Sequence, residues 1–346
     1  MNSKEFGFTL REQKPQTTQV VYTDNAFDFL PKGDFVLIVD KNVLRLNPLL
    51  RKYRYIEVEA TEAGKTLRTA DEIFASLLKF EAGRQTEIVG IGGGIICDIA
   101  GFVSATYKRG TPLILMPTTL LAQADAGLGG KNGVNFRDVK NIVGTIRQPS
   151  QIIIGRYVRQ TLDCEQMRNG LVEIVKTACV CDAGLFSLLE NAGESELLNP
   201  LSDLVQNAVE RASQDKLLIV KDDPFETGKR RILNFGHTFG HAIEAYLHIP
   251  HGFAVAVGMR VATKIAESEY SLPKETCLRI NSLLTKIGID EIDFPPAEKI
   301  AKFLIEDKKR EDNFIRFIVA NEIGKAEIKK IKLKELYEKY ADMCKY

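Results

Sequence analysis

All four histidines of this chain lie between positions 237 and 251, as His237, His241, His248 and His251. On a helix, His237 and His241 stand at positions i and i+4, so both rings would project from one face. Imidazole nitrogen is a preferred ligand of borderline metals such as zinc. Spacing alone therefore predicts His237 and His241 as a metal-binding pair with an unnamed third ligand. Histidines at a helix surface or cap are the alternative.

Glu173 and Lys176 form a second candidate set, because positions i and i+3 share one helix face. A carboxylate and an ammonium in this arrangement are usually a surface salt bridge. From these residues alone the salt bridge is the favoured interpretation, and a reactive pair is the alternative.

Three consecutive glycines, Gly92 to Gly94, follow an apolar run and precede an apolar helical pattern. Bare backbone N–H groups at a helix N-terminus can face a pyrophosphate. The segment is not the G-x-G-x-x-G fingerprint, and a tight turn without a ligand explains the glycines nearly as well.

Basic and amide side chains recur beside glycines and turns. Lysine and arginine next to small residues suit a phosphate or a carboxylate, because the side-chain donors and the glycine backbone can both approach an oxyanion. Each of them singly is equally consistent with a solvated charge. The set comprises Arg109, Lys131, Lys140, Asn141, Lys216, Arg230 and Asn234.

The elements that must position these residues change character along the chain. Up to about Pro149, short apolar runs alternate with a helical pattern, which predicts a parallel sheet with ligands at the carboxyl ends of its strands. Beyond that point the patterns are mostly helical, for example over Leu171 to Leu189 and Leu201 to Val220. The sequence therefore predicts an α/β domain over residues 1–149 and a mostly helical domain over residues 150–346.

Composition excludes several classes of protein. The 346 residues are 45% hydrophobic, enough for two packed domains, and 47 basic residues nearly cancel 46 acidic ones. We therefore expect no binding to nucleic acid or to membranes. The N-terminal residues are charged where a signal peptide is apolar, and the six cysteines are scattered, so we expect a cytoplasmic protein with reduced thiols.

The segment from Gly92 to Gly144 resembles the central signature of the 3-dehydroquinate synthase family of sugar-phosphate cyclases. Three further stretches continue the resemblance in the same order: 169–176, 234–245 and His251-Gly252. Asp307-Lys308-Lys309 adds a late match, and the similarity extends over residues 35 to 325.

The resemblance implies a Rossmann-like NAD-binding domain, a helical metal-binding domain, an active site between them and a homodimer. It also implies Glu173, His237 and His251 as ligands of a divalent metal, usually zinc and alternatively cobalt. This set replaces the pair suggested by spacing, and His241 then lies beside the substrate.

The family reaction converts a phosphorylated sugar acid, 3-deoxy-arabino-heptulosonate 7-phosphate, to 3-dehydroquinate and phosphate. NAD removes a hydride, phosphate leaves by β-elimination, the hydride returns, and an internal aldol step closes the carbocycle. An amino-dehydroquinate synthase would show the same residues. A polyol or glycerol-phosphate dehydrogenase and a non-catalytic relative are further alternatives.

Substrate and cofactor contacts follow from the resemblance by motif position. The phosphate-side groups are Lys131, Asn141 and one of Lys308 and Lys309, with Arg109 reaching over from the partner subunit. The carboxylate and hydroxyl groups are held by Lys216, Arg230 and Asn234, and Lys176, Asp125 and Glu226 complete the active site. The NAD contacts are Asp40, Asn42, Glu62, Lys65, Gly93, Gly94, Asp98, Thr118, Thr119, Lys131, Lys140 and Thr161.

Four positions depart from the family pattern. Thr61 replaces the Gly of the usual G-E-x-x-K segment, Phe253 replaces the usual Glu after His-Gly, Asn132 replaces a Thr, and Gly155 replaces an Asp. Such changes indicate either a divergent synthase or a paralogue with a related substrate. Glu62 is retained and can accept ribose hydroxyls, which favours NAD over NADP.

Overall fold

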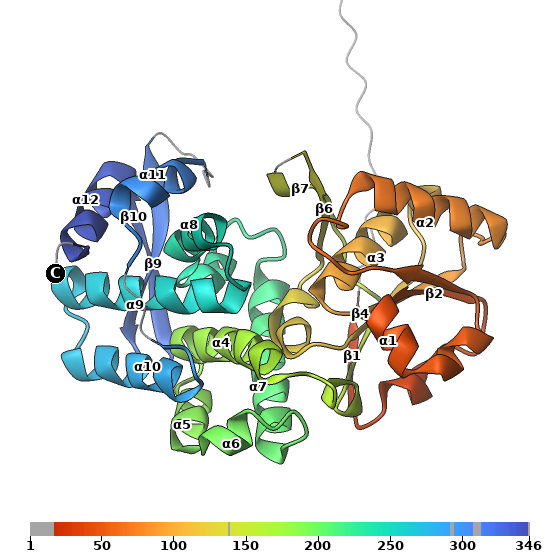
Figure 1. Cartoon of the computed structure of the whole chain (residues 1–346), viewed down its shortest axis with the longest axis horizontal. Coiled ribbons are helices and arrows are strands. Elements are labelled where there is room, and N and C mark those ends of the chain that lie inside the picture. Colours follow the sequence, from red (N-terminus) through yellow and green to blue (C-terminus); the bar gives the residue numbers. More distant parts are fainter. Residues whose placement is uncertain (1–16, 138, 291–293, 307–312, 345–346) are drawn as a thin grey trace, which may run out of the picture.

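A computed structural model describes residues 17–137, 139–290, 294–306 and 313–344 of the chain. Lys308 and Lys309 lie outside these ranges, so the predicted phosphate contact from this pair stays a prediction. The chain forms an α/β half and a mostly helical half, side by side (Figure 1).

The α/β half is built on a six-stranded sheet in the order β1-β8-β5-β4-β2-β3, and every pairing is parallel. Parallel strands are covered on both faces and therefore read as continuous apolar runs, as Leu113–Pro117 does. The strands are β1 (Gln19–Thr23), β2 (Phe35–Asp40), β3 (Tyr55–Val58), β4 (Glu87–Gly92), β5 (Leu113–Pro117) and β8 (Gln151–Gly155).

The two faces of the sheet carry separate cores. Alternate residues of β2 divide between them, with Val36 and Ile38 on one face and Leu37 and Val39 on the other. Helices α2 (Leu67–Lys79) and α3 (Gly94–Thr106) cover the first face, whereas α1 (Lys41–Leu46) packs on the second. Strand β4 runs directly into α3, so the glycine turn lies at the carboxyl edge of the sheet.

A β-hairpin leaves this half beside the helical half (Figure 1). Strand β6 (Lys131–Phe136) packs against α3 and pairs with β7 (Val139–Ile146) in antiparallel register. Strand β7 is exposed over most of its length. The hairpin can therefore present its side chains to both halves.

The helical half surrounds α4 (Cys164–Cys181) and α9 (His251–Tyr270), whose middle turns are buried. A capping box formed by Asp163 and Gln166 fixes the start of α4. The other helices are α5 (Ala183–Asn191), α6 (Glu194–Leu197), α7 (Asp203–Asp222), α8 (His237–Leu247), α10 (Lys274–Lys286), α11 (Ala297–Glu306) and α12 (Leu333–Met343). Strands β9 (Phe314–Glu322) and β10 (Lys325–Lys332) form a hairpin against α9 and α4.

The helical pattern predicted over Leu171 to Leu189 is two helices rather than one. Asp182 interrupts it and caps α5 by accepting a hydrogen bond from the backbone N–H of Leu185. Aspartate competes with the helical backbone in this way, which is why it favours helix starts. Within the described ranges, no helix combines the length and apolar character needed to cross a bilayer.

Candidate active site

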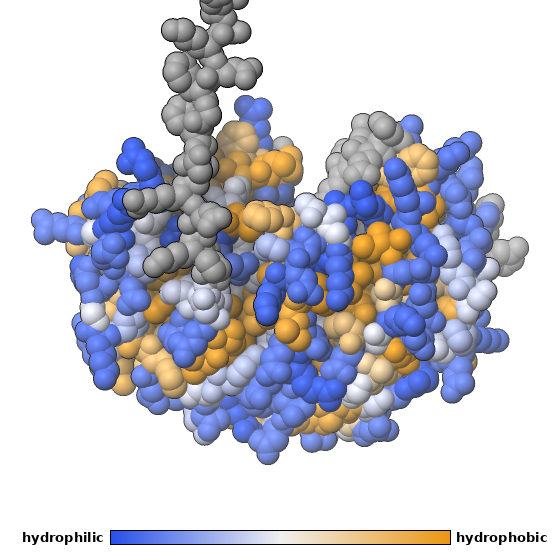
Figure 2. All heavy atoms as spheres, turned by 180° about the vertical axis from the view of Figure 1, so that it is seen from behind, coloured by the Kyte–Doolittle hydropathy of each residue, from blue (hydrophilic) through white to orange (hydrophobic). Residues whose placement is uncertain are grey.

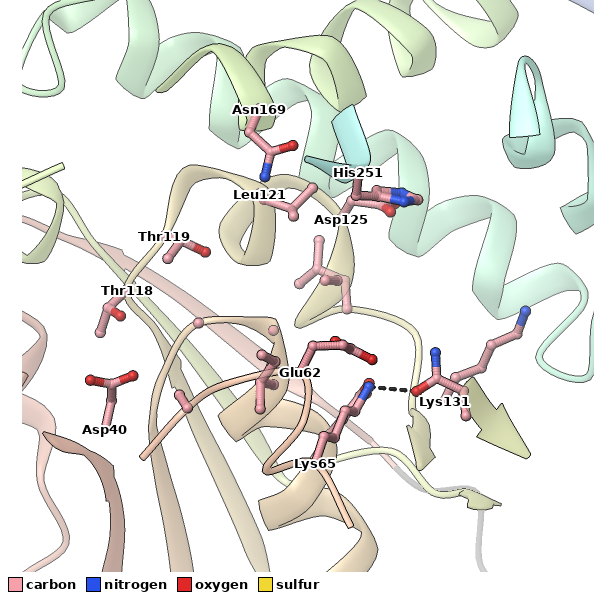
Figure 3. A pocket seen from close by; sticks show the side chains of 18 of the residues that line it. Asp40, Glu62, Lys65, Thr118, Thr119, Leu121, Asp125, Lys131, Asn169 and His251 are labelled. Carbon is pink, nitrogen blue, oxygen red and sulfur yellow. Dashed lines mark hydrogen bonds and ion pairs between the residues drawn. The ribbon is translucent and has the colours of Figure 1, made fainter. Parts of the chain in front are cut away.

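A cavity of about 2180 Å³ lies between the carboxyl edge of the sheet and the helical half. Its mouth is the notch between the two halves at the top of Figure 2. Asp40 and Thr118 line the sheet side, and His251 lies across the cavity from them (Figure 3). Of the predicted site residues that the structure describes, only Arg109 and Glu173 do not line it, and Glu173 is buried directly behind it.

The glycine turn brings backbone close to the cavity. Gly93 is the N-cap of α3 and offers no side chain, and the first turn of the helix lines the cavity through Gly93, Gly94 and Ile95. A Cβ on Gly92 would meet Ile96 at 2.5 Å, so the tight passage from β4 to α3 requires glycine there. An uncapped helix N-terminus facing a cavity is suited to a pyrophosphate.

Asn135 joins two of the predicted site residues, and the sequence analysis did not single it out. Its side-chain amide donates to Oε1 of Glu62 at 2.8 Å, and its Oδ1 accepts from the backbone N–H of Asn141 at 2.8 Å. Asn141 has a left-handed backbone, with φ of 53°, so this contact supports a conformation that costs free energy. Asn135 thus positions a predicted cofactor contact and a predicted substrate contact together.

Lys65 is almost fully buried at the same place. Its ammonium contacts the carboxylate of Asp98 on α3 and Oδ1 of Asn141 on β7. Burial raises the pKa of Asp98, and the charge of Lys65 opposes that effect. The contacts of Lys65 tie the hairpin to the glycine-turn helix, so these predicted cofactor residues form one connected network.

Glu173, His237 and His251 bring three donor atoms within 4.8 Å of one another, which is the geometry that a single metal ion requires. Nε2 of His251 lies 3.4 Å from Oε1 of Glu173, and Nε2 of His237 lies 3.9 Å from the same oxygen. Nδ1 of His237 donates to the backbone oxygen of Phe235 at 3.1 Å. That hydrogen bond leaves the Nε2 lone pair of His237 facing Glu173.

The electrostatics of this cluster favour a bound cation. Glu173 is fully buried, and neither carboxylate oxygen has a hydrogen-bond partner of ordinary geometry in the described ranges. Burial alone would raise the pKa of Glu173, but Lys176 and the two histidines lower it well below its usual value. Burial, helped by Lys176, lowers the pKa of His237, which keeps that ring neutral and able to coordinate.

Two interpretations drawn from spacing alone are corrected here. Glu173 and Lys176 do form an ion pair, but their side chains are 0% and 1% exposed, so the pair is not a surface salt bridge. Spacing could not reveal this, because both faces of α4 are buried along that stretch. The His237 and His241 rings are 5.1 Å apart, yet the donor cluster found among the described residues takes His251 in place of His241.

Asp125 holds two lysines together at the floor of the cavity. Lys216 donates to the backbone oxygen of Asp125 at 2.8 Å and contacts its carboxylate, and Lys176 lies 3.7 Å from the same carboxylate. Burial lowers the pKa of Lys216 and is only partly opposed by Asp125. Asp125 and Glu173 outweigh burial at Lys176 and raise its pKa. The pair provides concentrated positive charge for an anionic ligand.

Glu226 gathers the remaining polar residues of the cavity. It accepts from the Asn234 side chain at 2.7 Å, it is ion-paired with Lys131, and its carboxylate lies 3.9 Å from Nε of Arg230. Arg230 is otherwise held by the backbone oxygen of Pro224. Lys131 comes from the α/β half and the other residues from the helical half, so this group spans the mouth between them.

Comparison with known proteins places this arrangement in a family. The family model described as 3-dehydroquinate synthase N-terminal matches residues 55–169, and the model described as 3-dehydroquinate synthase C-terminal matches residues 170–310. This chain belongs to the 3-dehydroquinate synthase family. The resemblance found in the sequence motifs is thereby confirmed.

Curated relatives agree with the family match. The 3-dehydroquinate synthase of Streptococcus thermophilus is 38% identical over 282 residues, covering 80% of this chain and 79% of the relative. The 3-dehydroquinate synthase of Thermoanaerobacter pseudethanolicus is 36% identical over 352 residues, covering 95% of this chain and 98% of the relative.

Solved structures confirm the predicted fold. The 2-epi-5-epi-valiolone synthase from Streptomyces hygroscopicus, solved with NAD⁺ and Zn²⁺ bound, superposes with a TM-score of 0.88 at 26% identity, covering 98% of this chain and 99% of its own. A 2-deoxy-scyllo-inosose synthase complexed with carbaglucose-6-phosphate, NAD⁺ and Co²⁺ superposes with a TM-score of 0.82 at 25% identity. The match covers 93% of this chain and 96% of that structure. An iron-containing alcohol dehydrogenase from Thermotoga maritima shares the fold alone, with a TM-score of 0.67 at 13% identity. The match covers 95% of this chain and 98% of that structure.

Two departures from the family pattern have local structural reasons. Asn132 is buried and donates to the backbone oxygens of Gly130 and Arg147, at 2.9 and 3.0 Å, so it closes the base of the hairpin beside Lys131. At Gly155 a Cβ would lie 2.7 Å from that of Ala26, which leaves no room for a side chain. Gly155 lies outside the lining of the cavity, whereas Asn132 is part of it.

Phe253 and Arg109 lie away from the cavity lining. Phe253 is partly buried and packs against the core of the helical half. Arg109 follows α3 in a left-handed conformation, with φ of 63°, and is absent from the lining of this subunit's cavity. Its predicted contribution from a partner subunit stays a prediction.

Asn169 and Glu244 line the cavity and were not predicted as site residues. Oδ1 of Asn169 accepts from the backbone N–H of Gly252 at 2.5 Å, which ties the start of α9 to α4 beside His251. Both residues fall within motif stretches that carry the family resemblance, and that was the one signal available for them.

Proposed function

We propose that this protein is a 3-dehydroquinate synthase that converts 3-deoxy-arabino-heptulosonate 7-phosphate to 3-dehydroquinate and phosphate. The observation that carries the proposal is the cluster of Glu173, His237 and His251 on one side of a cavity whose other side is an uncapped glycine turn. Family membership supports the same activity, and the relatives named above are 3-dehydroquinate synthases.

The residues present fit both NAD and a divalent metal. Glu173 is a buried carboxylate that is ion-paired with Lys176 through Oε2, and two imidazole nitrogens face its Oε1. The glycine turn offers an uncapped helix N-terminus for the pyrophosphate, and Glu62 offers a carboxylate for ribose hydroxyls. When bound, the metal would polarise the hydroxyl to be oxidised, and NAD would accept and later return the hydride.

The roles of the polar side chains follow from the halves they come from. Lys131 and Asn141 on the hairpin would bind the phosphate of the substrate, and Lys216, Arg230 and Asn234 would bind its carboxylate and hydroxyls. Guanidinium and ammonium groups in a partly closed cavity bind such oxyanions strongly, because little water competes with them. Holding both ends of the substrate would fix the reacting carbon atoms relative to the cofactor.

His241 is the side chain that we propose to hold or move a proton during elimination and ring closure. Its ring lies 5.1 Å from that of His237 and 6.0 Å from that of His251, and it lines the cavity. It is thus close to the proposed metal site without belonging to the donor cluster. Imidazole is the side chain best matched to proton transfer near neutral pH.

We also propose a cytoplasmic homodimer. Strand β7 carries Val139, Ile142 and Ile146 as exposed apolar side chains, and it pairs only with β6 in the described ranges. Such an edge is a suitable surface for a second subunit. The six free thiols suit a reducing compartment.

Phosphate release from purified protein tests the proposed function. The protein is loaded with zinc or cobalt, supplied with NAD or NADP, and given 3-deoxy-arabino-heptulosonate 7-phosphate, and the organic product is identified. We expect stoichiometric phosphate and 3-dehydroquinate with NAD. Folded, metal-loaded protein that releases no phosphate from this substrate, but does so from the amino analogue or from a neutral sugar phosphate, would contradict the assigned substrate.

A further inference from the structure

Glu244 connects residues from three elements through its two carboxylate oxygens. Oε2 accepts a hydrogen bond from Nδ1 of His251 at 2.8 Å, and Oε1 accepts one from Nζ of Lys140. Glu244 belongs to α8, His251 begins α9, and Lys140 lies on β7 of the other half. One side chain therefore joins the helical half to the hairpin of the α/β half.

On the metal side, Glu244 fixes the orientation of a ligand. Nδ1 of His251 can donate to Glu244 only when it carries the proton, so the coordinating lone pair is at Nε2, the atom 3.4 Å from Glu173. A carboxylate that holds the second nitrogen of a histidine both orients the ring and increases its basicity.

On the cofactor side, the partner of Glu244 continues into the NAD network. Lys140 is followed by Asn141, whose side chain accepts from Lys65, and Lys65 is paired with Asp98 on the glycine-turn helix. A connected path thus runs from α3, through the hairpin and Glu244, to His251. Its links are hydrogen bonds and ion pairs, except for the peptide bond that joins Lys140 to Asn141.

The alternative is that Lys140 and Glu244 form an incidental surface salt bridge, because the Lys140 side chain is 56% exposed. Glu244 itself is only 17% exposed. A partly buried carboxylate with both oxygens occupied by charge-assisted contacts is a fixed structural element rather than a mobile surface group.

We propose that Glu244 is a positioning residue that couples the metal site to the NAD site. With Glu244 in place, binding of the metal at His251 stabilises the hairpin position that NAD requires, and NAD in turn favours metal binding, since such coupling is reciprocal. The inference rests on the proposed function, because it assumes that both groups bind here.

The test measures binding without turnover in the full-length protein and in three variants: Glu244→Ala, Glu244→Gln and Lys140→Met. Cobalt affinity is obtained by competition with a chelator, and the visible spectrum of bound Co²⁺ reports ligand geometry. NAD affinity is titrated with and without cobalt. The ratio of the NAD dissociation constants without and with cobalt measures the coupling between the two sites. Direct loss of an NAD contact raises both constants by the same factor, so it leaves this ratio unchanged.

We expect wild-type protein to bind NAD about fivefold or more tightly when cobalt is present. Glu244→Ala should bind cobalt roughly 10- to 100-fold more weakly, with an altered Co²⁺ spectrum, and its coupling ratio should fall to about one. Lys140→Met should keep the wild-type Co²⁺ spectrum and still lose the coupling. Glu244→Gln should lose the coupling with a smaller loss of cobalt affinity, because the amide oxygen can still accept a hydrogen bond from His251. This variant replaces Glu244→Ala in the test if the alanine variant misfolds.

Glu190→Gln is the control, because Glu190 forms a partly exposed ion pair with Arg279 and neither residue lines the cavity. It should behave as wild type in every measurement. A Glu244→Ala protein with wild-type cobalt affinity and spectrum, or variants that keep the wild-type coupling ratio, would overturn the inference alone. Wild-type protein that binds neither cobalt nor NAD would instead contradict the proposed function.

Discussion

Nε2 of His251, in the first turn of α9, lies 3.4 Å from Oε1 of Glu173, in the middle of α4, and the α4 side chain is completely buried. Two helices that are distant in the sequence thus meet at one pair of atoms. His237, which begins α8, completes the cluster. Three separate helices must pack correctly before these donors come together.

Loss of a ligand should therefore remove metal and activity together. We expect Glu173→Gln, His237→Ala and His251→Ala to lose bound metal and at least 1000-fold in turnover, because elimination requires prior oxidation of the polarised hydroxyl. His241→Ala should keep the metal and lose turnover alone. Elemental analysis beside phosphate release checks both. A His241→Ala protein without metal would reverse our assignment of ligands.

Removal of Asn135 should weaken two sites at once. Asn135→Ala takes a donor from Glu62 and an acceptor from the backbone of Asn141, so KM for NAD and KM for the sugar phosphate should each rise about 5- to 10-fold, as loss of ~1 kcal/mol per hydrogen bond implies. Asn191→Ala, which removes an exposed side chain of α5, is the control. A rise in only one KM would show that Asn135 supports one site.

Arg230 should discriminate the acidic substrate from neutral ones. We expect Arg230→Lys to lower kcat/KM for 3-deoxy-arabino-heptulosonate 7-phosphate about 10- to 100-fold, because lysine cannot reproduce the planar donor pair. NAD affinity should be unchanged. Steady-state kinetics with equilibrium titration of NAD checks both, and equal losses in catalysis and NAD affinity would indicate a general distortion of the cavity.

Asp215 should make stability depend on pH. Burial and the neighbouring Asp182 carboxylate raise the pKa of Asp215 to about 6, and one of its oxygens has no hydrogen-bond partner among the described residues. Between the ordinary value of 3.8 and about 6, the folded state binds more protons than the unfolded chain, so the free energy of unfolding falls as pH rises through that window.

Asp215→Asn should remove this penalty. Above pH 6 we expect it to raise the free energy of unfolding by about 1 kcal/mol, a figure reduced for solvent screening of a half-exposed group. At pH 4 it should match wild type. Urea unfolding at both pH values is the measurement, with Asp222→Asn, an exposed residue of the same helix, as control. Equal effects at the two pH values would exclude titration of Asp215 as the cause.

Local patterns predicted the glycine turn, the parallel strands and most helices, because these depend on residues close together in the chain. Spacing within one helix failed at His237 and His241, since the third donor, His251, begins a different helix. It also failed for Lys176, whose burial depends on packing from several elements. Glu244 and Asn135 act through partners far along the chain, so only the folded structure could reveal them.

The cores of the two halves are not separate. Leu120, Ile152 and Ile154 come from the α/β half, yet they pack in the same cluster as α4 and α9. A cut between β8 and α4 would leave complementary apolar surfaces on both fragments, which would associate or aggregate rather than remain apart. This protein therefore cannot be treated as two exchangeable modules: a new cofactor half would have to bring its own matching surface for the metal half.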